Sequence, residues 1–439
     1  MVEARPRQLL ILAGCLDLLG LSVGVVLLVL VRGLPLQGQG AAIATTICVY
    51  LLLGWLFGTY TLLRWRQLPF STLCQRLALN AFGTLVVIAI VRWSVNHDAA
   101  LWVFQRLNQL LWIGFSAFWS LLIRLALRRG LLQGDPPAVV CLISDPEARH
   151  IEREWALTPT RHTPMRINVD QLLDVGLPLV LAVSAEARLR PDVARVLRVL
   201  EEHDPRDCLI TTPLGLAERE LERLPAALIN TTWFGYGELP ATQMFSPSRQ
   251  LKRVADLIVA LGLLVLSCPV LLLCAALIHL EDGGPVFYVQ RRSGWLGRSF
   301  QLYKLRTMRV ARPGERPSWT EPGDLRITHV GLWLRRARLD ELPQLINVLR
   351  GDMSLIGPRP ERPELEALLE EQIPHYRKRH WMRPGLSGWA QVSAPYAASV
   401  EDSELKLSYD LFYLKHFSTW MDVVILLRTI KTVLKLAGR

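Results

Sequence analysis

Four long apolar runs near the N-terminus constrain the fold more than any other feature of this 439-residue sequence. They cover residues 9–31, 41–63, 77–91 and 107–123. Two of them reach the roughly 20 residues that a helix needs to cross a bilayer, the third is short, and the fourth carries interior polar residues. The first run is too long for the core of a signal peptide, and no small-residue cleavage site follows it. We therefore expect four transmembrane helices within residues 1–136.

Arginines flank these runs unequally, which predicts their orientation. One side would carry most of them: Arg5, Arg7, Arg64, Arg66, Arg76, Arg124, Arg128 and Arg129. The other side would carry Arg32, Arg92 and Arg106. Positive charge gathers on the cytoplasmic side of a membrane, so we expect the N-terminus and everything after the fourth span to be cytoplasmic. Asp17, inside the first run, is either a packed carboxylate or a functional intramembrane one.

Residues 137–248 have the composition of a soluble α/β module. Residues 138–144, 179–184 and 208–212 are apolar enough to form buried strands, and residues 147–155 and 192–203 are predicted helices. This alternation predicts a small parallel sheet, a degenerate Rossmann-like unit. The first strand is followed by SDPEAR rather than by a glycine-rich loop, so we expect no dinucleotide site there.

The charge distribution favours some partners over others. The net charge is +7 over residues 1–136, −5 over 137–248 and +9 over 249–439. The basic blocks also carry the apolar runs, so a membrane surface or a phosphorylated substrate is the expected partner rather than nucleic acid. The seven cysteines are scattered without a CxxC pair, which argues against a zinc site or a disulfide framework.

A fifth apolar run, residues 257–278, contains Ser267 and Pro269 near its centre. A proline removes one backbone hydrogen bond and kinks or breaks a helix. The run is therefore either a kinked fifth span or a re-entrant helix over about residues 254–278 that enters one leaflet and returns. Basic clusters lie on both sides: Arg249, Lys252 and Arg253 before it, and Arg291, Arg292 and Arg298 after it. A full crossing would put one cluster outside, so we expect re-entry.

Three further elements are predicted downstream. Residues 286–290 and 300–305 alternate and are joined by a turn over 294–297, which predicts a hairpin. Residues 311–324 are rich in proline and glycine and could form a loop that moves over a site. Residues 420–436 carry their cations on one face, which is typical of a helix lying in the membrane interface.

The densest group of reactive residues lies between residues 335 and 360. Asp340 and Glu341 precede Pro343 at the start of a predicted short helix, residues 342–349. Alone, Asp340 would be an N-cap. Five arginines surround the pair in sequence: Arg335, Arg336, Arg338, Arg350 and Arg359. Arginine matches phosphate oxygens, so the pattern suits a nucleophilic carboxylate beside a magnesium ligand.

Several strings in the last 190 residues carry a family resemblance. They are KLRTM at 304–308, DELPQLINVLRGDMSLIGPRPE at 340–361, RPGLSGWAQV at 383–392 and SYDLFYLKHFSTWMD at 408–422. Together they resemble the bacterial sugar transferase family, the monotopic polyprenyl-phosphate hexose-1-phosphate transferases. The resemblance implies an α/β catalytic domain over residues 249–439 with interfacial helices. The preceding spans and module resemble those of the large members that start exopolysaccharide or O-antigen synthesis.

The resemblance implies an activity and a set of site residues. A UDP-sugar would donate sugar-1-phosphate to undecaprenyl phosphate and release UMP, at the cytoplasmic face of the bacterial inner membrane, with Mg²⁺ as cofactor. Asp340 would be the nucleophile that forms a phosphosugar-aspartyl intermediate, and Glu341 would help to hold the metal. The implied substrate-binding residues are Lys304, Arg306, Arg335, Arg338 and Arg359, and those implied for the re-entrant helix are Lys252, Arg253, Ser267 and Pro269. A homodimer is also implied.

Weaker candidates and one rival function remain. His375 and His380 could shuttle protons but are expected to pack at the surface, and Asp352 suits a metal or a helix-terminating turn equally. The rival is a non-catalytic membrane scaffold or regulator of polysaccharide assembly that uses the α/β module to bind a regulator. Which sugar is transferred is not encoded in any motif, because related hexoses differ by single hydroxyl groups.

Overall fold

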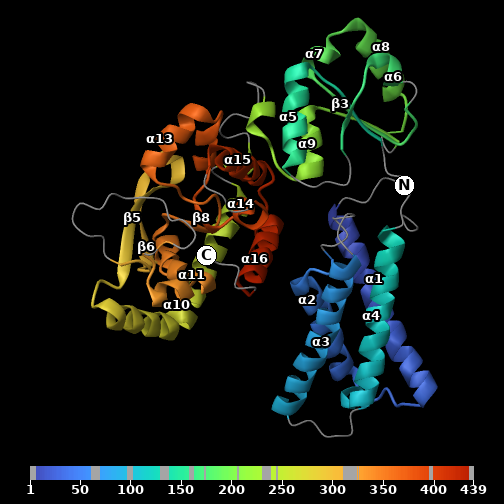
Figure 1. The fold of residues 1–439 in the computed structure, drawn as a ribbon, viewed down its shortest axis with the longest axis vertical. Helices are drawn as coiled ribbons and strands as arrows, with labels where there is room; N and C mark the ends of the chain where they lie inside the picture. The colour runs from blue at the N-terminus through green and yellow to red at the C-terminus, as the bar shows by residue number, and fades with distance from the viewer. Residues whose placement is uncertain are drawn as a thin grey trace. The chain divides into compact units, whose positions relative to one another are not determined.

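A computed structural model describes residues 6–60, 70–95, 102–128, 138–157, 163–172, 175–204, 207–229, 239–243, 246–309, 324, 326–394 and 399–434. The chain divides into two compact units, Met1–Pro213 and Leu214–Arg439. Figure 1 traces the helices and strands of both units along the chain.

Four apolar helices form the N-terminal part of the first unit, as predicted. They are α1 (Pro6–Arg32), α2 (Gly40–Phe57), α3 (Phe70–Val95) and α4 (Arg106–Arg128). Each is long and apolar enough to cross a membrane by length and composition. Helix α2 ends earlier than the apolar run predicts, because Gly58 adopts a left-handed conformation with φ 76° that terminates it. The protein is therefore a membrane protein in its N-terminal region.

A buried ion pair joins α1 to α4. Arg124 donates from both terminal nitrogens to Asp17, at 2.8 and 2.7 Å, and Ser120 donates to the same carboxylate at 2.6 Å. Both charged side chains are 1% exposed. Of the two interpretations of Asp17, the structure favours the packed carboxylate, because its oxygens are occupied by groups that hold two helices together.

The α/β part of the first unit contains a four-stranded parallel sheet in the order β2-β1-β3-β4. The strands are β1 (Ala138–Leu142), β2 (Met165–Arg166), β3 (Leu179–Val183) and β4 (Cys208–Thr211), and the helices are α5 (Asp145–Ala156), α6 (Val169–Leu172), α7 (Ala185–Arg188) and α8 (Pro191–Glu201). Three strands and two helices were predicted. Strand β2, α6 and α7 were missed, because two to four residues are too short for a periodic pattern.

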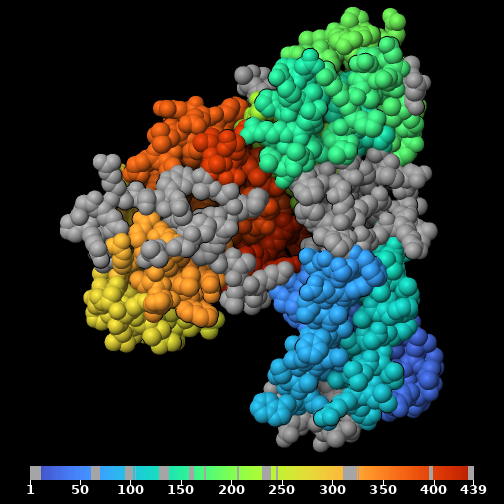
Figure 2. All heavy atoms as spheres, in the orientation of Figure 1, coloured from blue at the N-terminus to red at the C-terminus, as the bar shows by residue number. Residues whose placement is uncertain are grey.

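The second unit is helix-rich and contains two small sheets. Its elements, from the unit boundary onwards, are α9 (Pro213–Leu221), η3 (Ala226–Leu228), α10 (Pro247–Asp282), β5 (Phe287–Ser293), η4 (Trp295–Gly297), β6 (Ser299–Leu305), α11 (His329–Ala337), η5 (Leu339–Glu341), α12 (Gln344–Arg350), β7 (Ser354–Ile356), α13 (Pro363–Gln372), η6 (Tyr376–Trp381), β8 (Gly385–Ser387), α14 (Trp389–Ser393), α15 (Val400–Lys415) and α16 (Thr419–Leu434). In Figure 2 the atoms of α10, β5 and β6, in yellow, adjoin those of α11 and α12, in orange.

The unit boundary at residue 213 differs from the predicted domain boundary at residue 248. The Trp389 indole donates to the carbonyl of Glu222 at 3.0 Å, and the Leu224 amide donates to Ser408 at 2.8 Å. Leu224 also lies in the hydrophobic core that surrounds α15. Residues 214–229 thus pack with the C-terminal unit, a tertiary contact that composition does not reveal.

Helix α10 is continuous through Pro269, so the predicted break is a bend within one helix. Figure 1 shows the change of direction along α10. The proline removes one backbone donor, and the Ser267 hydroxyl donates to the carbonyl of Leu264 at 3.4 Å in the same turn. One lost hydrogen bond kinks the helix without ending it.

The predicted hairpin is confirmed, and a helix is present where the C-terminal interfacial helix is predicted. Strands β5 and β6 pair antiparallel from Phe287 opposite Leu305 to Ser293 opposite Ser299. Helix α16 covers most of the predicted residues 420–436, and Trp420 on it is 66% exposed. The predicted loop at 311–324 lies outside the described residues except for Asp324. Strands β7 and β8 pair in parallel, with Ser354 opposite Gly385 and Ile356 opposite Ser387.

Candidate active site

Asp340 and Glu341 lie in η5, a single 3-10 turn between α11 and α12. Arg338 adopts a left-handed conformation with φ 55°, ends α11 and turns the chain into η5. Helix α12 begins with Pro343 at its N-cap and has no side-chain capping bond. The alternative that Asp340 is an N-cap is therefore wrong, because the 3-10 turn places two residues between Asp340 and the cap.

Two cations from distant elements contact Glu341. The Lys304 ammonium, on β6, lies 3.2 Å from Oε1, and the Arg359 guanidinium, in the segment after β7, lies 2.7 Å from the same oxygen. Burial opposes ionisation of Glu341, but the charges of Arg359 and Lys304 outweigh it and lower the pKa of Glu341 well below its usual value. Burial in turn lowers the pKa of Lys304. Glu341 is thus held as a carboxylate.

The pKa of Asp340 is shifted in the opposite direction from that of Glu341, although the two residues are adjacent. It is 9% exposed, and burial followed by the charge of Glu341 raises the pKa of Asp340 to about 6. Lys304, Arg335 and Arg359 oppose this shift without cancelling it. Two adjacent carboxylates with pKa values pushed apart are typical of sites that divide chemical roles between them. Asp340 is therefore the more basic of the two carboxylates.

Arg335 and Arg338 complete the cluster from α11. Arg335 Nε donates to the Thr307 hydroxyl at 2.9 Å, and Arg338 Nη1 lies 3.8 Å from Glu341 Oε2. Gly331 allows this arrangement, because a Cβ there would lie 2.1 Å from the carbonyl oxygen of Thr307. The close approach packs the start of α11 against the end of β6.

Arg306 does not join the cluster. Its guanidinium forms an ion pair with Asp282 at the end of α10 and also donates to the carbonyl of Pro285 at 2.6 Å. Arg336 and Arg350 also point elsewhere: Arg336 lies over the Trp333 ring, and Arg350 donates to the Tyr303 hydroxyl at 2.6 Å. Fewer arginines contact the dyad than their closeness in sequence predicts. Side chains that are neighbours in sequence point in different directions, so these three arginines have other partners.

The residues predicted for the re-entrant helix lie along α10. Lys252 lies 2.9 Å from Asp422 on α16, and Arg253 donates to the carbonyl of Val348 at 2.8 Å, at the end of α12. Ser267 and Pro269 lie at the bend, outside the dyad cluster. Lys252 and Arg253 therefore attach the start of α10 to the rest of the unit.

Comparison with known proteins matches this unit. Residues 247–436 match the family model described as bacterial sugar transferase, and the match begins at the first residue of α10. A UDP-N-acetylgalactosamine-undecaprenyl-phosphate N-acetylgalactosaminephosphotransferase of Aeromonas hydrophila is 45% identical over 184 residues, which are 42% of this chain and 44% of the relative. A UDP-glucose:undecaprenyl-phosphate glucose-1-phosphate transferase of Caulobacter vibrioides is 44% identical over 185 residues, which are 42% of this chain and 69% of the relative.

An uncharacterized sugar transferase of Bacillus subtilis is 39% identical over 192 residues, which are 43% of this chain and 89% of the relative. The chain belongs to the bacterial sugar transferase family. The resemblance found in the sequence is thereby confirmed, and the predicted enzyme class agrees with the names of the relatives. The sugar transferase match contains all the residues of the dyad cluster. The chain spans less than half of the length of the Aeromonas relative.

Sequence reasoning missed a supporting layer of the sugar transferase site. Arg379 is 5% exposed and donates to the carbonyl of Arg359 at 2.9 Å and to the Tyr376 hydroxyl at 2.6 Å. Its terminal nitrogen also lies 3.0 Å from Asp410, whose pKa burial raises to about 6. The available signal was an aspartate within the otherwise apolar run LSYDLFYL, since buried carboxylates are rare unless paired.

The remaining weaker candidates have partners of their own. His380 lies 3.1 Å from Glu366, and Asp352 accepts from the Asn347 side chain at 3.2 Å. Within the described part of the chain, no three His, Cys, Asp or Glu side chains are grouped to hold a metal. The adjacent carboxylates of Asp340 and Glu341 still fit magnesium, which binds through one or two carboxylates together with substrate phosphates.

Proposed function

We propose that this protein transfers a sugar-1-phosphate from a UDP-sugar to undecaprenyl phosphate, giving a polyprenyl diphosphosugar and UMP. The observation that carries the proposal is the cluster at η5, where Glu341 contacts Lys304 and Arg359 and where the charges of Lys304, Arg335 and Arg359 act on Asp340. The names of the Aeromonas and Caulobacter relatives support the acceptor and the donor class. The sugar itself stays open, because those two relatives carry different hexoses in their names.

In this proposal Asp340 is the nucleophile, because it is the more basic carboxylate of the pair. Its carboxylate attacks the phosphorus attached to the sugar, an aspartyl O–P bond forms, and the bond to the bridging oxygen breaks as UMP leaves. A phosphate oxygen of undecaprenyl phosphate then attacks the same phosphorus and releases Asp340. Two steps through one carboxylate let two anionic substrates use one site in turn. Lys304, Arg335 and Arg359 offset the negative charge that develops on the phosphoryl oxygens.

Glu341 is the residue that would help to hold Mg²⁺ in this proposal. A bound magnesium ion would neutralise phosphate charge, as in other phosphoryl transfers. Glu341 suits this role because its pKa is held low, so it remains an anion throughout the physiological pH range.

The contacts of α10 support a re-entrant helix rather than a fifth span. Near its start, Arg253 and Asp256 contact α12 and β7. Near its end, Ile278 packs with Leu305 of β6 and Leu334 of α11, and Asp282 forms an ion pair with Arg306, which follows β6. A straight helix of 36 residues would separate its ends by about 54 Å. Because both ends attach to one unit, the bend at Pro269 would turn the apolar middle into one leaflet and back.

Topology can be tested by labelling. In a variant without the native cysteines, Leu251→Cys and Leu280→Cys place one thiol near each end of α10, at residues that are 57% and 80% exposed. A membrane-impermeant maleimide should label both in inverted vesicles and neither in sealed right-side-out vesicles. Labelling of the two positions from opposite sides would establish a fifth span instead.

The arginine distribution around α1 to α4 supports a location in the bacterial inner membrane with the catalytic unit on the cytoplasmic face. The degenerate Rossmann-like module would then also be cytoplasmic. We place the reaction at the first membrane step of exopolysaccharide or O-antigen synthesis, and we expect a homodimer. Mass photometry of the full chain in detergent checks the oligomeric state, and a protein that remains monomeric at micromolar concentration would contradict it.

The activity test uses purified full-length protein with a panel of UDP-sugars, Mg²⁺ and undecaprenyl phosphate. Wild-type protein should release UMP with one donor, and Asp340→Asn should not. Without acceptor, mass spectrometry should find one sugar-phosphate on Asp340. A non-catalytic scaffold would release no UMP with any donor, and Arg335, Asp340 and Arg359 would each be dispensable for its role in cells.

A further inference from the structure

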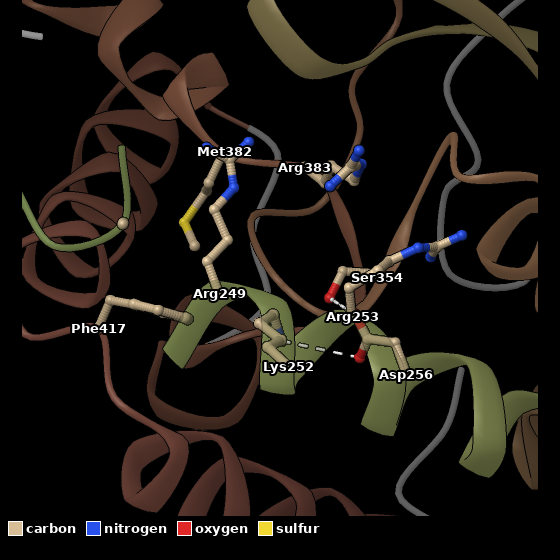
Figure 3. A pocket seen from close by; sticks show the side chains of 9 residues that line it. Arg249, Lys252, Arg253, Asp256, Ser354, Met382, Arg383 and Phe417 are labelled. Atoms are coloured by element: carbon tan, nitrogen blue, oxygen red, sulfur yellow. Dashed lines mark hydrogen bonds and ion pairs between the residues drawn. The ribbon is translucent and has the colours of Figure 1, made fainter. Parts of the chain in front are cut away.

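A second cationic cleft lies away from the dyad. It is lined by Arg249, Lys252, Arg253 and Asp256 of α10, Ser354 of β7, and Met382 and Arg383, together with Ala241 and Phe417. Figure 3 shows α10 on one side of the cleft and the segment carrying Met382 and Arg383 on the other. Arg253 binds the C-terminal end of α12. The dyad lies just before the other end of that helix, and its seven residues are about 10 Å long. The cleft is thus separate from the Asp340 cluster.

The two acidic groups at the cleft share one lysine, because Lys252 lies 3.8 Å from Asp256 and 2.9 Å from Asp422. Asp256 accepts from the Ser354 hydroxyl at 2.7 Å and from the Leu355 amide at 3.3 Å. Asp422 is bound by Lys252 and also accepts from the Tyr413 hydroxyl. Lys252 and the three arginines outnumber these two carboxylates, so the cleft keeps a net positive charge.

No carboxylate among the described residues lies within ion-pair distance of Arg249, Arg253 or Arg383. Arg253 contacts backbone carbonyls of α12, and Arg383 Nε donates to the carbonyl of Gly351 at 3.0 Å. Burial, together with the charges of Arg253 and Arg249, lowers the pKa of Arg383. Like charges held together in a partly buried cleft attract an anion.

Trp295 fixes two of these arginines near each other. The guanidiniums of Arg249 and Arg383 lie 5.1 and 5.0 Å from the centroid of its ring. Such contacts hold a guanidinium in place without neutralising it. The two guanidiniums therefore lie within about 10 Å of each other, beside one aromatic ring.

The surroundings of the cleft indicate where the anion comes from. Along α10 the basic residues give way to exposed apolar ones, with Ile258 67% and Leu261 55% exposed. The bond from Lys252 to Asp422 brings α16 alongside, and there Trp420 is 66% exposed. A basic cleft at the polar end of two exposed apolar helices lies where lipid head groups lie.

We propose that this cleft binds the phosphate group of a membrane lipid and so fixes the depth of α10 in the interface. The inference uses the membrane position proposed for α10, and it does not depend on the reaction proposed at Asp340. Arg249 and Arg383 would hold the phosphate oxygens, while the acyl chains lie against the apolar surfaces of α10 and α16.

The test is a thermal-melting titration of the full-length protein in neutral detergent with three probes. Dioctanoyl phosphatidylglycerol carries both phosphate and acyl chains, dioctanoylglycerol lacks the phosphate, and inorganic phosphate lacks the chains. Only the first should raise the melting temperature at submillimolar concentration. An equal shift with dioctanoylglycerol or with inorganic phosphate would overturn the proposal, since binding would then need only one half of the lipid.

Variants locate the binding site. Arg249→Gln should weaken the apparent affinity for phosphatidylglycerol about tenfold, the effect of losing one charge-assisted hydrogen bond. Arg249→Lys should weaken it less. The control Arg377→Gln removes an arginine whose side chain is 80% exposed and should change nothing. Asp340→Asn should bind as wild type does. Unchanged affinity in Arg249→Gln, or lost affinity in Asp340→Asn, would contradict the assignment.

Discussion

Arg359 Nη2 and Glu341 Oε1 lie 2.7 Å apart, the shortest ion pair in the η5 cluster. The two residues come from different elements, since Glu341 ends a 3-10 turn and Arg359 follows β7. The backbone of Arg359 is itself fixed from behind, because Arg379 donates to its carbonyl oxygen. Glu341 is thus ionised by a cation whose position depends on a third segment of the chain.

Replacing Arg359 tests this relationship. Arg359→Lys keeps the charge but loses the forked donor set, so we expect kcat for UMP release to fall about 10- to 100-fold. Arg350→Lys is the matched control, because Arg350 contacts Tyr303 rather than the dyad. A variant with wild-type kcat at saturating donor would show that Arg359 does not contact the transferring phosphate.

The pH dependence of the first half-reaction reports on Asp340. The nucleophile must be ionised, and its pKa is raised to about 6, so kcat/KM should fall as pH drops through 6 and approach a tenfold loss per unit below it. The measurement is UMP release in a single turnover without acceptor, which removes the ionisation of undecaprenyl phosphate from the profile. A rate that stays level down to pH 4.5 would exclude a carboxylate with this pKa as the nucleophile.

The same shift predicts that Asp340 is costly to stability. Its folded pKa lies above the ordinary value, so above pH 6 the folded protein must bury a charge that the unfolded chain keeps in water. Two units correspond to about 3 kcal/mol. Asp340→Asn should therefore melt a few degrees above wild type at pH 8, and the difference should shrink towards pH 4.5, where wild type is protonated. A variant that is inactive and also less stable at pH 8 would refute this account of the raised pKa.

Arg306 separates a substrate-binding role from a structural one. The structure places it on Asp282, so Arg306→Gln should lower the melting temperature by loosening the end of α10, while KM for the donor stays within about twofold of wild type. Asp282→Asn should lower stability in the same way. A tenfold rise in KM for Arg306→Gln with unchanged melting would instead favour the role implied by the family motif.

Arg379 is expected to act through Arg359 as a positioning residue. Arg379→Lys loses the hydrogen bonds to the Arg359 carbonyl and to Tyr376, so kcat should fall about tenfold with little change in donor KM. In a double-mutant cycle with Arg359→Lys, the two losses should be less than additive. Fully additive losses would show that Arg379 stabilises the fold independently of Arg359.

Local patterns predicted the longer elements of the first unit and, in the second unit, α10, α12, α16 and the β5–β6 hairpin. Apolar length predicted α1 to α4, continuous apolar runs predicted β1, β3 and β4, alternation predicted the β5–β6 hairpin, and cation spacing predicted α16. These signals are local, because each depends on residues within one helix or strand. Elements of two to four residues, such as β2 and α7, gave no such signal.

Tertiary contacts decided the rest. The sequence by itself determined that Asp340 and Glu341 are adjacent carboxylates in a basic, membrane-associated family segment. Only the fold decided which cations reach them: Lys304 and Arg359 do, whereas Arg306, Arg336 and Arg350 pair elsewhere. The physical reason is that ion pairing depends on distances of a few ångströms between side chains from separate elements, and these distances are set by packing. The same packing buries Asp340 and places Lys304 and Arg359 against Glu341. The two adjacent acids therefore differ in pKa.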